Sequence, residues 1–203
     1  MTEKRHLILA SGSSARRAML SNAGLTFDVI PADIDEDAIK TAVLAADPHA
    51  APSDIAVRLA AEKARAVSRQ HPGLPVIGAD QVLVFEDMLY AKAGSLLEAR
   101  AVLKKLRGRT HILISAAALA RDAEVLWQGS DSARLTMREF SDAFLAQYLD
   151  FAGAGILACV GCYELEGKGI QLFEKIDGDY FTILGLPLLP LMAALRANGA
   201  VMA

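Results

Sequence analysis

The stretch LILASGSSARR, residues 7–17, passes from an apolar run through small polar residues to two arginines. Four apolar residues suit a short buried strand, which we expect over residues 7–10. Apolar residues then recur at helical spacing until Gly24, so we expect a helix over residues 15–23. We expect the small polar residues between the strand and the helix to form a turn. The stretch therefore predicts a strand-turn-helix unit at the start of the fold.

The turn itself carries the residue types of an anion site. A turn that opens a helix points backbone N–H groups and the positive end of the helix dipole at one place. Serine hydroxyls and guanidinium groups can add hydrogen bonds there. We therefore expect a phosphate-like ligand at Ser11, Ser13, Arg16 and Arg17. The alternative is a capped surface helix with solvated arginines. The stretch matches neither a Walker loop nor a dinucleotide-binding glycine motif.

Composition narrows the classes of protein. The chain has 203 residues, 53% hydrophobic and 22% charged, which is typical of a globular protein with one substantial core. A net charge of -3 argues against non-specific nucleic-acid binding, so we expect no nucleic-acid partner. The most apolar region, residues 181–195, is shorter than the roughly 20 residues of a membrane-spanning helix. We interpret it as a strand end, a turn and a helix, and expect no membrane segment.

The two cysteines, Cys159 and Cys162, form a single C-x-x-C. Zinc needs four ligands, and the four histidines lack ligand spacing. A redox pair is one alternative, while two incidental thiols in a reducing compartment is the interpretation we favour. The apolar run near the N-terminus is too short for a secretory signal, so we expect a cytoplasmic protein.

Two charged side chains fall where the pattern predicts burial. In the helix expected over residues 53–69, with Ser53 as its cap, Lys63 lies on the stripe of apolar positions. In the nearly continuous apolar run 76–85, Asp80 and Gln81 are the polar exceptions. A buried charge needs a partner, so Lys63 either meets an anion or extends its ammonium to the edge. Asp80 is either a metal ligand or a base, or it satisfies loose backbone N–H groups.

The remaining segments are read more coarsely. The acidic cluster at residues 33–37 either caps a helix or supplies a carboxylate for Mg²⁺ or Mn²⁺, and residues 41–52 look like a connection. Lys92 follows a hairpin turn and is expected across it from the neighbourhood of Asp80. Further strands are expected over 27–30, 110–120, 125–137 and 171–176, and further helices over 95–106 and 141–149.

Taken in order, these motifs resemble the Maf family of nucleotide pyrophosphatases over essentially the whole chain. The matching stretches are LILASGSSARR at 7–17, Asp35-Glu36, EKA at 62–64, GAD at 78–80, Glu166-Gly167, GDY at 178–180 and GLPL at 185–188. The resemblance implies an α/β fold in which a long, mixed, twisted sheet is flanked by helices and two lobes enclose a central cleft. It also implies a single Maf-like domain over residues 1–203.

The family's activity implies roles for individual residues. It is the metal-dependent hydrolysis of a nucleoside triphosphate to the monophosphate and pyrophosphate, a housecleaning role in the nucleotide pool. Asp80 would accept the proton of the water that attacks the α-phosphorus. Ser11, Arg16, Lys63 and Lys92 would hold phosphates, and Glu36 would bind a divalent cation, Mg²⁺ or Mn²⁺, together with Asp80.

Substrate choice in the family is read at three positions, occupied here by Ala15, Gln81 and Glu166. Gln81 and Glu166 are similar to the branch that acts on 7-methyl-GTP, and a carboxylate can accept hydrogen bonds from a guanine edge. Ala15 stands where that branch usually has Trp, and Ala91-Lys92-Ala93 replaces the usual Gly-Lys-Pro. The alternatives are an enzyme preferring dTTP or UTP and a catalytically impaired regulator of cell division. A homodimer is a candidate assembly.

Overall fold

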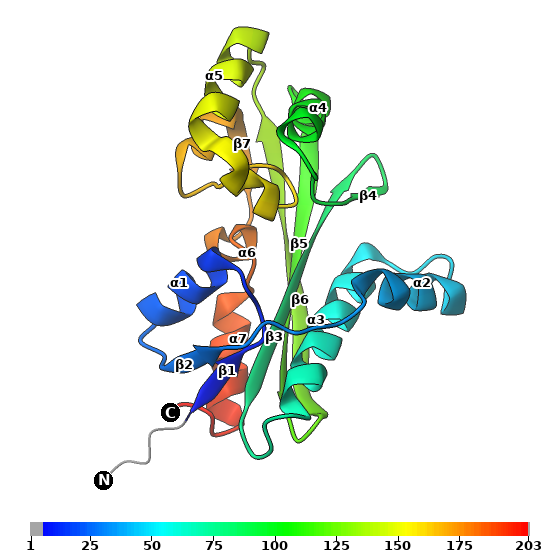
Figure 1. The fold of residues 1–203 in the computed structure, drawn as a ribbon, viewed down its shortest axis with the longest axis vertical. Coiled ribbons are helices and arrows are strands. Elements are labelled where there is room, and N and C mark those ends of the chain that lie inside the picture. The colour runs from blue at the N-terminus through cyan, green and yellow to red at the C-terminus, as the bar shows by residue number, and fades with distance from the viewer. Residues whose placement is uncertain (1–5, 203) are drawn as a thin grey trace. The chain divides into compact units, whose positions relative to one another are not determined.

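A computed structural model describes residues 6–202 of the chain (Figure 1). Its strands are β1 (Leu7–Leu9), β2 (Phe27–Val29), β3 (Val76–Phe85), β4 (Met88–Tyr90), β5 (Thr110–Arg121), β6 (Glu124–Met137) and β7 (Phe173–Asp177). Its helices are α1 (Ser14–Asn22), α2 (Glu36–Ala46), α3 (Pro52–Ser68), α4 (Leu96–Leu106), α5 (Asp142–Ala152), α6 (Tyr180–Ile183) and α7 (Leu188–Ala197), with 3₁₀ turns η1 (Gly153–Ala158) and η2 (Lys168–Leu172).

The expected α/β fold with a mixed sheet flanked by helices is confirmed. Within the described residues the sheet has seven strands in the order β2-β1-β3-β5-β6-β7, and β4 pairs with β3. The pairs β1–β2 and β1–β3 are parallel, while β3–β4 and β6–β7 are antiparallel. None of the helices between residues 6 and 202 is both long and apolar enough to cross a bilayer.

The chain divides into two compact units, and β3, β5 and β6 each contribute residues to both. Unit 1 takes the described residues of Met1–Asp80, Ser115–Asp131 and Gly185–Ala203, and unit 2 takes Gln81–Ile114 and Ser132–Leu184. A single Maf-like domain over residues 1–203 and a cleft between two lobes both stay predictions.

In unit 1, α1 and α7 lie on one side of the strands and α3 lies on the other (Figure 1). The three residues of β1 are fully buried, and so are Ile55 and Leu59 on the inner face of α3. Each such aliphatic side chain contributes about 1.5–3 kcal/mol on burial. This apolar packing fixes α3 against the sheet.

Gly78 lets α3 approach the backbone of β3 closely. A Cβ at position 78 would lie 2.6 Å from the backbone nitrogen of Ala64 and would also clash with the carbonyl oxygen of Ala60. Residues two apart on a strand face the same side, so Asp80 faces α3 as Gly78 does. The close approach therefore brings Lys63, the neighbour of Ala64, to Asp80.

In unit 2, α4 and α5 pack against each other. Their apolar faces share one core with the ends of the long strands, in which Leu83, Leu103 and Leu135 are completely buried. The same core reaches Tyr163 and Leu165, the residues that lead into the loop at Glu166.

Several local expectations were wrong. Residues 41–46 are helical, not a connection, because Asp35 caps α2 through the backbone N–H of Ala38 and alanine favours helix. Helix α3 begins at Pro52, so Ser53 is not its cap, and proline is well suited to a first helical position. Residues 180–183 form α6 in place of a strand end. The segment 168–172 is a 3₁₀ turn, which delays β7 to Phe173.

Candidate functional site

The strand-turn-helix unit at the start of the chain folds as predicted. β1 ends at Leu9 and α1 begins at Ser14. The Ser13 hydroxyl caps α1 by accepting a hydrogen bond from the backbone N–H of Arg16 at 3.3 Å. The N–H of Ser13 in turn donates to the buried hydroxyl of Ser11 at 3.4 Å. Both serines are thus part of the turn that opens the helix.

Arg16 is held by three oxygen atoms of unit 1. Its Nε donates to the carbonyl of Gly185 at 2.9 Å, and Nη1 donates to Ser11 Oγ at 3.0 Å and to the carbonyl of Ala79 at 3.1 Å. Burial lowers the pKa of Arg16, while the negative charges of Asp80 and Glu36 act in the opposite direction. Arginine stays protonated in proteins, so this is a fixed positive charge in a defined orientation.

Lys63 binds two carboxylates. Its Nζ lies 2.6 Å from Oδ1 of Asp80 and 2.8 Å from Oε1 of Glu36. The side chains of Lys63 and Asp80 are only 12% and 10% exposed, whereas that of Glu36 is 44% exposed. The lysine on the apolar stripe therefore meets anions, as one of the two sequence interpretations required.

These contacts gather six of the predicted residues in unit 1. Two cations and two carboxylates come from four different elements, since Arg16 lies on α1, Glu36 on α2, Lys63 on α3 and Asp80 on β3. Ser11 and Ser13 complete the set through Arg16. The cations can bind an anionic ligand, and a carboxylate among them can accept a proton.

The carboxylates also fit a divalent cation in part. Glu36 and Asp80 reach the same ammonium group, so their oxygens converge on one position. Within residues 6–202, no cluster of three or more His, Cys, Asp or Glu side chains is placed to hold a metal ion. Mg²⁺ is usually bound by one or two carboxylates plus substrate phosphates, so two carboxylates suffice as the protein's share of such a site.

None of these contacts involves the other predicted residues. Arg17 is exposed on α1, and Ala15 is half-buried in its first turn. Lys92 is exposed in unit 2, and the β3–β4 pairing ends at Leu83 and Tyr90, so the hairpin ladder does not reach it. The expected position of Lys92, across the hairpin from the neighbourhood of Asp80, stays a prediction.

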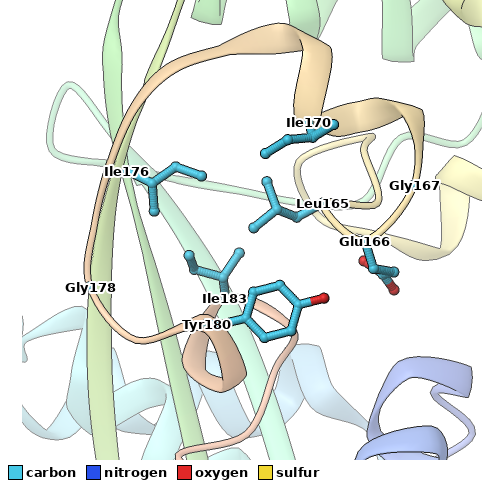
Figure 2. Close-up of a pocket in the computed structure, with 8 residues that line it drawn as sticks. All are labelled: Leu165, Glu166, Gly167, Ile170, Ile176, Gly178, Tyr180 and Ile183. Atoms are coloured by element: carbon cyan, nitrogen blue, oxygen red, sulfur yellow. The ribbon is translucent and has the colours of Figure 1, made fainter.

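Unit 2 contains a cavity of about 400 Å³ beside Glu166. Its lining residues are Leu165, Glu166, Gly167, Ile170, Ile176, Gly178, Tyr180 and Ile183. Figure 2 shows four aliphatic side chains turned toward one another, with the ring of Tyr180 between them and the carboxylate of Glu166. The cavity therefore has an apolar wall, an aromatic ring and one acidic group.

The side chain of Gln81 donates hydrogen bonds to α6. Its Nε2 donates to the carbonyl of Ile183 at 2.9 Å and to that of Thr182 at 3.3 Å. The residue that follows Asp80 is thus bound to the short helix that supplies Tyr180 to the cavity. In the sequence, GDY at 178–180 stands out only as a family motif. The signal that singles out Tyr180 is an aromatic residue directly after a Gly-Asp helix cap.

The two thiols are poorly suited to redox or nucleophilic chemistry. Both cysteines are free. Burial, together with the charges of Glu164 and Glu166, raises the pKa of Cys159 to about 11, and burial raises that of Cys162 to about 11. Thiols that stay protonated at neutral pH are weak nucleophiles. The structure therefore favours the interpretation that Cys159 and Cys162 are incidental thiols and not a redox pair.

Comparison with known proteins points to one family. A family model described as Maf-like protein matches residues 6–198. The nucleoside triphosphate pyrophosphatase of Caulobacter vibrioides is 54% identical over 193 residues, which cover 95% of this chain and 96% of that protein. The 7-methyl-GTP pyrophosphatase of Mesorhizobium japonicum is 51% identical over 201 residues, which cover 99% of each.

Among solved structures, a HAM1 protein from Coxiella burnetii matches with a TM-score of 0.43 and 20% identity, covering 65% of this chain and 72% of that one. The assignment rests on the family model and on the full-length relatives. This chain belongs to the Maf family.

Proposed function

We propose that this protein is a nucleoside triphosphate pyrophosphatase that releases a nucleoside monophosphate and pyrophosphate. The observation that carries the proposal is the ammonium of Lys63, held between Asp80 and Glu36 beside the fixed guanidinium of Arg16. The full-length relative from Caulobacter vibrioides carries that activity in its name.

The cations of unit 1 suit the polyphosphate of such a substrate. The chain as a whole has a net charge of -3, so attraction of a triphosphate has to come from local positive groups. Arg16 presents a planar guanidinium, and Lys63 presents an ammonium that can exchange a carboxylate oxygen for a phosphate oxygen. The hydroxyls of Ser11 and Ser13 and the first turn of α1 add hydrogen-bonding groups beside Arg16.

Asp80 is the group proposed to activate water. Its carboxylate takes a proton from the water as the water oxygen forms a bond to the α-phosphorus. The bond between the α-phosphorus and the bridging oxygen breaks, and pyrophosphate leaves with that oxygen. The contact with Lys63 orients the carboxylate, and the nearby cations stabilise the negative charge on the phosphoryl oxygens.

Glu36 and Asp80 are the residues proposed to hold a divalent cation, Mg²⁺ or Mn²⁺. Such an ion, when bound, neutralises phosphate charge and polarises the phosphorus–oxygen bonds. Because Lys63 now contacts both carboxylates, it would share them with the ion or turn toward a phosphate.

The cavity at Glu166 is the proposed site for the base. A carboxylate accepts hydrogen bonds from the N1–H and the amine of guanine, which favours a guanine nucleotide. One relative is named 7-methyl-GTP pyrophosphatase, and we place 7-methyl-GTP first among the candidate substrates. The expected role is the removal of unsuitable nucleotides from a cytoplasmic pool, by a monomer or a homodimer.

Turnover of a nucleotide panel tests the proposal. The purified protein is incubated with 7-methyl-GTP, GTP, ATP, CTP, UTP and dTTP and with Mg²⁺ or Mn²⁺, and the products are separated by chromatography. Monophosphate and pyrophosphate are expected in equal amounts, and hydrolysis in ¹⁸O-labelled water is expected to label the monophosphate. Binding without turnover of any triphosphate would overturn the proposal in favour of a catalytically impaired regulator.

A further inference from the structure

We propose that Tyr180 is the aromatic wall against which the substrate base stacks, and that Gln81 is a positioning residue that holds Tyr180 in place through α6. The inference rests on the proposed function, since it takes the base of a nucleotide as the occupant of the cavity in unit 2. The resemblance marks Gln81 only as one of three positions at which the family's substrate choice is read, and the role proposed here acts through α6.

The cavity has the size and chemistry for a planar base. Its volume of about 400 Å³ lies at the lower end of the range for small-molecule sites, about 300–1,000 Å³. Leu165, Ile170, Ile176 and Ile183 provide apolar surface for the flat face of a ring system. Glu166, the one acidic residue of the lining, can accept hydrogen bonds from the edge of that ring. A purine such as guanine combines these two features.

Tyr180 is the aromatic residue of that lining. Its side chain is exposed at 49% even though it borders the cavity, so part of the ring surface is available to a ligand. In Figure 2 the ring lies between the aliphatic side chains and the Glu166 carboxylate. A base stacked on this ring would place its edge toward Glu166, which joins the two recognition features in one pose.

The position of Tyr180 depends on a very short helix. A helix of four residues has little stability of its own, because one turn fixes many dihedral angles for few hydrogen bonds. At its start, Asp179 Oδ1 accepts from the backbone N–H of Thr182 at 3.0 Å. At its end, the Gln81 amide donates to the carbonyls of Thr182 and Ile183, which are among the last carbonyls of the helix. Side chains at both ends therefore hold α6 in place.

Gly178 restricts the same segment from the other direction. A Cβ at this position, where φ is +142°, would lie 2.6 Å from the Cβ of Ala133 on β6. The backbone therefore lies close against β6 just before α6 begins. Gln81 holds the segment that follows Tyr180 through the Thr182 and Ile183 carbonyls. Tyr180 and Ile183 are among the described residues that line the cavity, whereas Gln81 is not. Gln81 therefore acts on the cavity through the helix.

The first experiment measures binding of nucleosides that carry no phosphate. Guanosine, 7-methylguanosine and cytidine are titrated into the wild type, Tyr180→Phe and Tyr180→Ala, with saturation-transfer NMR as the readout. Tyr180→Phe keeps the stacking ring and should bind guanosine within about twofold of the wild type. Tyr180→Ala should bind about ten- to a hundredfold more weakly. Phe151→Ala, which truncates another exposed aromatic residue, is the matched control and should bind as the wild type does.

The second experiment tests whether Gln81 acts through Tyr180. Gln81→Glu keeps the shape of the side chain and replaces the donating amide by a carboxylate, which cannot donate to the Thr182 and Ile183 carbonyls. Alone it should weaken guanosine binding by about tenfold, and in the Tyr180→Ala background it should add less than about twofold. Gln128→Glu, an exposed substitution on β6, serves as the control.

The outcomes separate this inference from the proposed function. Wild-type affinity in Tyr180→Ala, no saturable nucleoside binding by the wild type, or effects of Gln81→Glu and Tyr180→Ala that simply multiply would each overturn the inference, even if triphosphates are hydrolysed. Should the Gln81 variant fail to fold, cross-relaxation between the purine H8 and the Tyr180 ring in the wild type decides the matter, and its absence overturns the inference. Nucleoside binding that needs Tyr180 without any triphosphate turnover would instead defeat only the proposed function.

Discussion

Lys63 Nζ lies 2.6 Å from Oδ1 of Asp80, and this ion pair joins α3 to β3 where both side chains are nearly closed to water. Breaking a buried pair by removing one partner costs more than the pair itself contributes, because the other charge stays behind. Lys63 and Asp80, the two charged residues that the sequence places in apolar surroundings, are therefore each other's ion-pair partners.

Asp80→Asn should lower kcat by about a hundredfold to ten-thousandfold, because an amide cannot take the proton of the attacking water. Binding of the triphosphate should remain measurable by calorimetry. Asp150→Asn, an exposed substitution on α5, should leave kcat unchanged. Full activity of Asp80→Asn would contradict the assigned role.

Lys63→Met should destabilise the protein by about 3–5 kcal/mol, because it leaves the Asp80 carboxylate buried without its ammonium partner. The same change should raise KM for the triphosphate, since a phosphate-binding cation is lost. Urea unfolding and steady-state kinetics measure the two effects. Lys175→Met on the exposed face of β7 is the control, and equal stability of the two variants would argue against a buried pair.

Gly78→Ala should reduce both stability and activity. The added Cβ would clash with the Ala60 carbonyl and the Ala64 nitrogen, so α3 must move away from β3 and carry Lys63 with it. A cost of about 1–3 kcal/mol is expected, as for other overpacked sites. Thermal unfolding and kcat/KM are the measurements. Gly155→Ala, whose Cβ meets nothing within 4 Å, should be nearly neutral, and a neutral Gly78→Ala would contradict the close approach.

Glu36→Gln should increase the concentration of Mg²⁺ or Mn²⁺ needed for half-maximal activity, and removal of divalent ions with EDTA should abolish turnover reversibly. The reason is that Glu36 supplies one of the two carboxylates that converge on Lys63. Asp37→Asn, one residue along the same turn of α2, is a matched control because its carboxylate faces Lys40. An identical metal requirement in the wild type and Glu36→Gln would rule out this ligand.

His111 should make the protein less stable in mild acid. Burial lowers the pKa of its imidazole from 6.5 to about 4, and Nε2 lies 2.6 Å from the hydroxyl of Tyr163. The unfolded chain takes up the proton first, so the stabilising effect is complete above pH 6.5 and is lost as the pH falls toward 4. The loss amounts to about 3 kcal/mol. Urea unfolding between pH 7.5 and pH 4.5 should reveal it.

The control for that pH dependence is another histidine. His49 is exposed, so His49→Gln should keep the dependence, whereas His111→Gln should flatten it. If both variants lose stability in acid as the wild type does, His111 is not the responsible group.

Local patterns predicted the elements around the candidate site well. The strand-turn-helix unit at Ser11 and Ser13, the stripe carrying Lys63 and the buried strand carrying Asp80 all formed as expected. Periodicity and helix caps are properties of neighbouring residues, so they can be read without the fold. The same reasoning failed at α6, because four residues are too few to show a helical period.

By itself, the sequence determined the strand-turn-helix unit, the helix that carries Lys63, the strand that carries Asp80, the presence of two charges in apolar surroundings and the motifs that resemble the Maf family. Only the tertiary structure decided which groups the site residues contact. Lys63 contacts Glu36, and Arg16 donates to the Gly185 carbonyl across 169 residues of sequence. Gln81 donates to α6 across about a hundred residues. Such pairs depend on how closely a helix can approach a strand, as Gly78 permits here, and no periodicity within a segment encodes that distance.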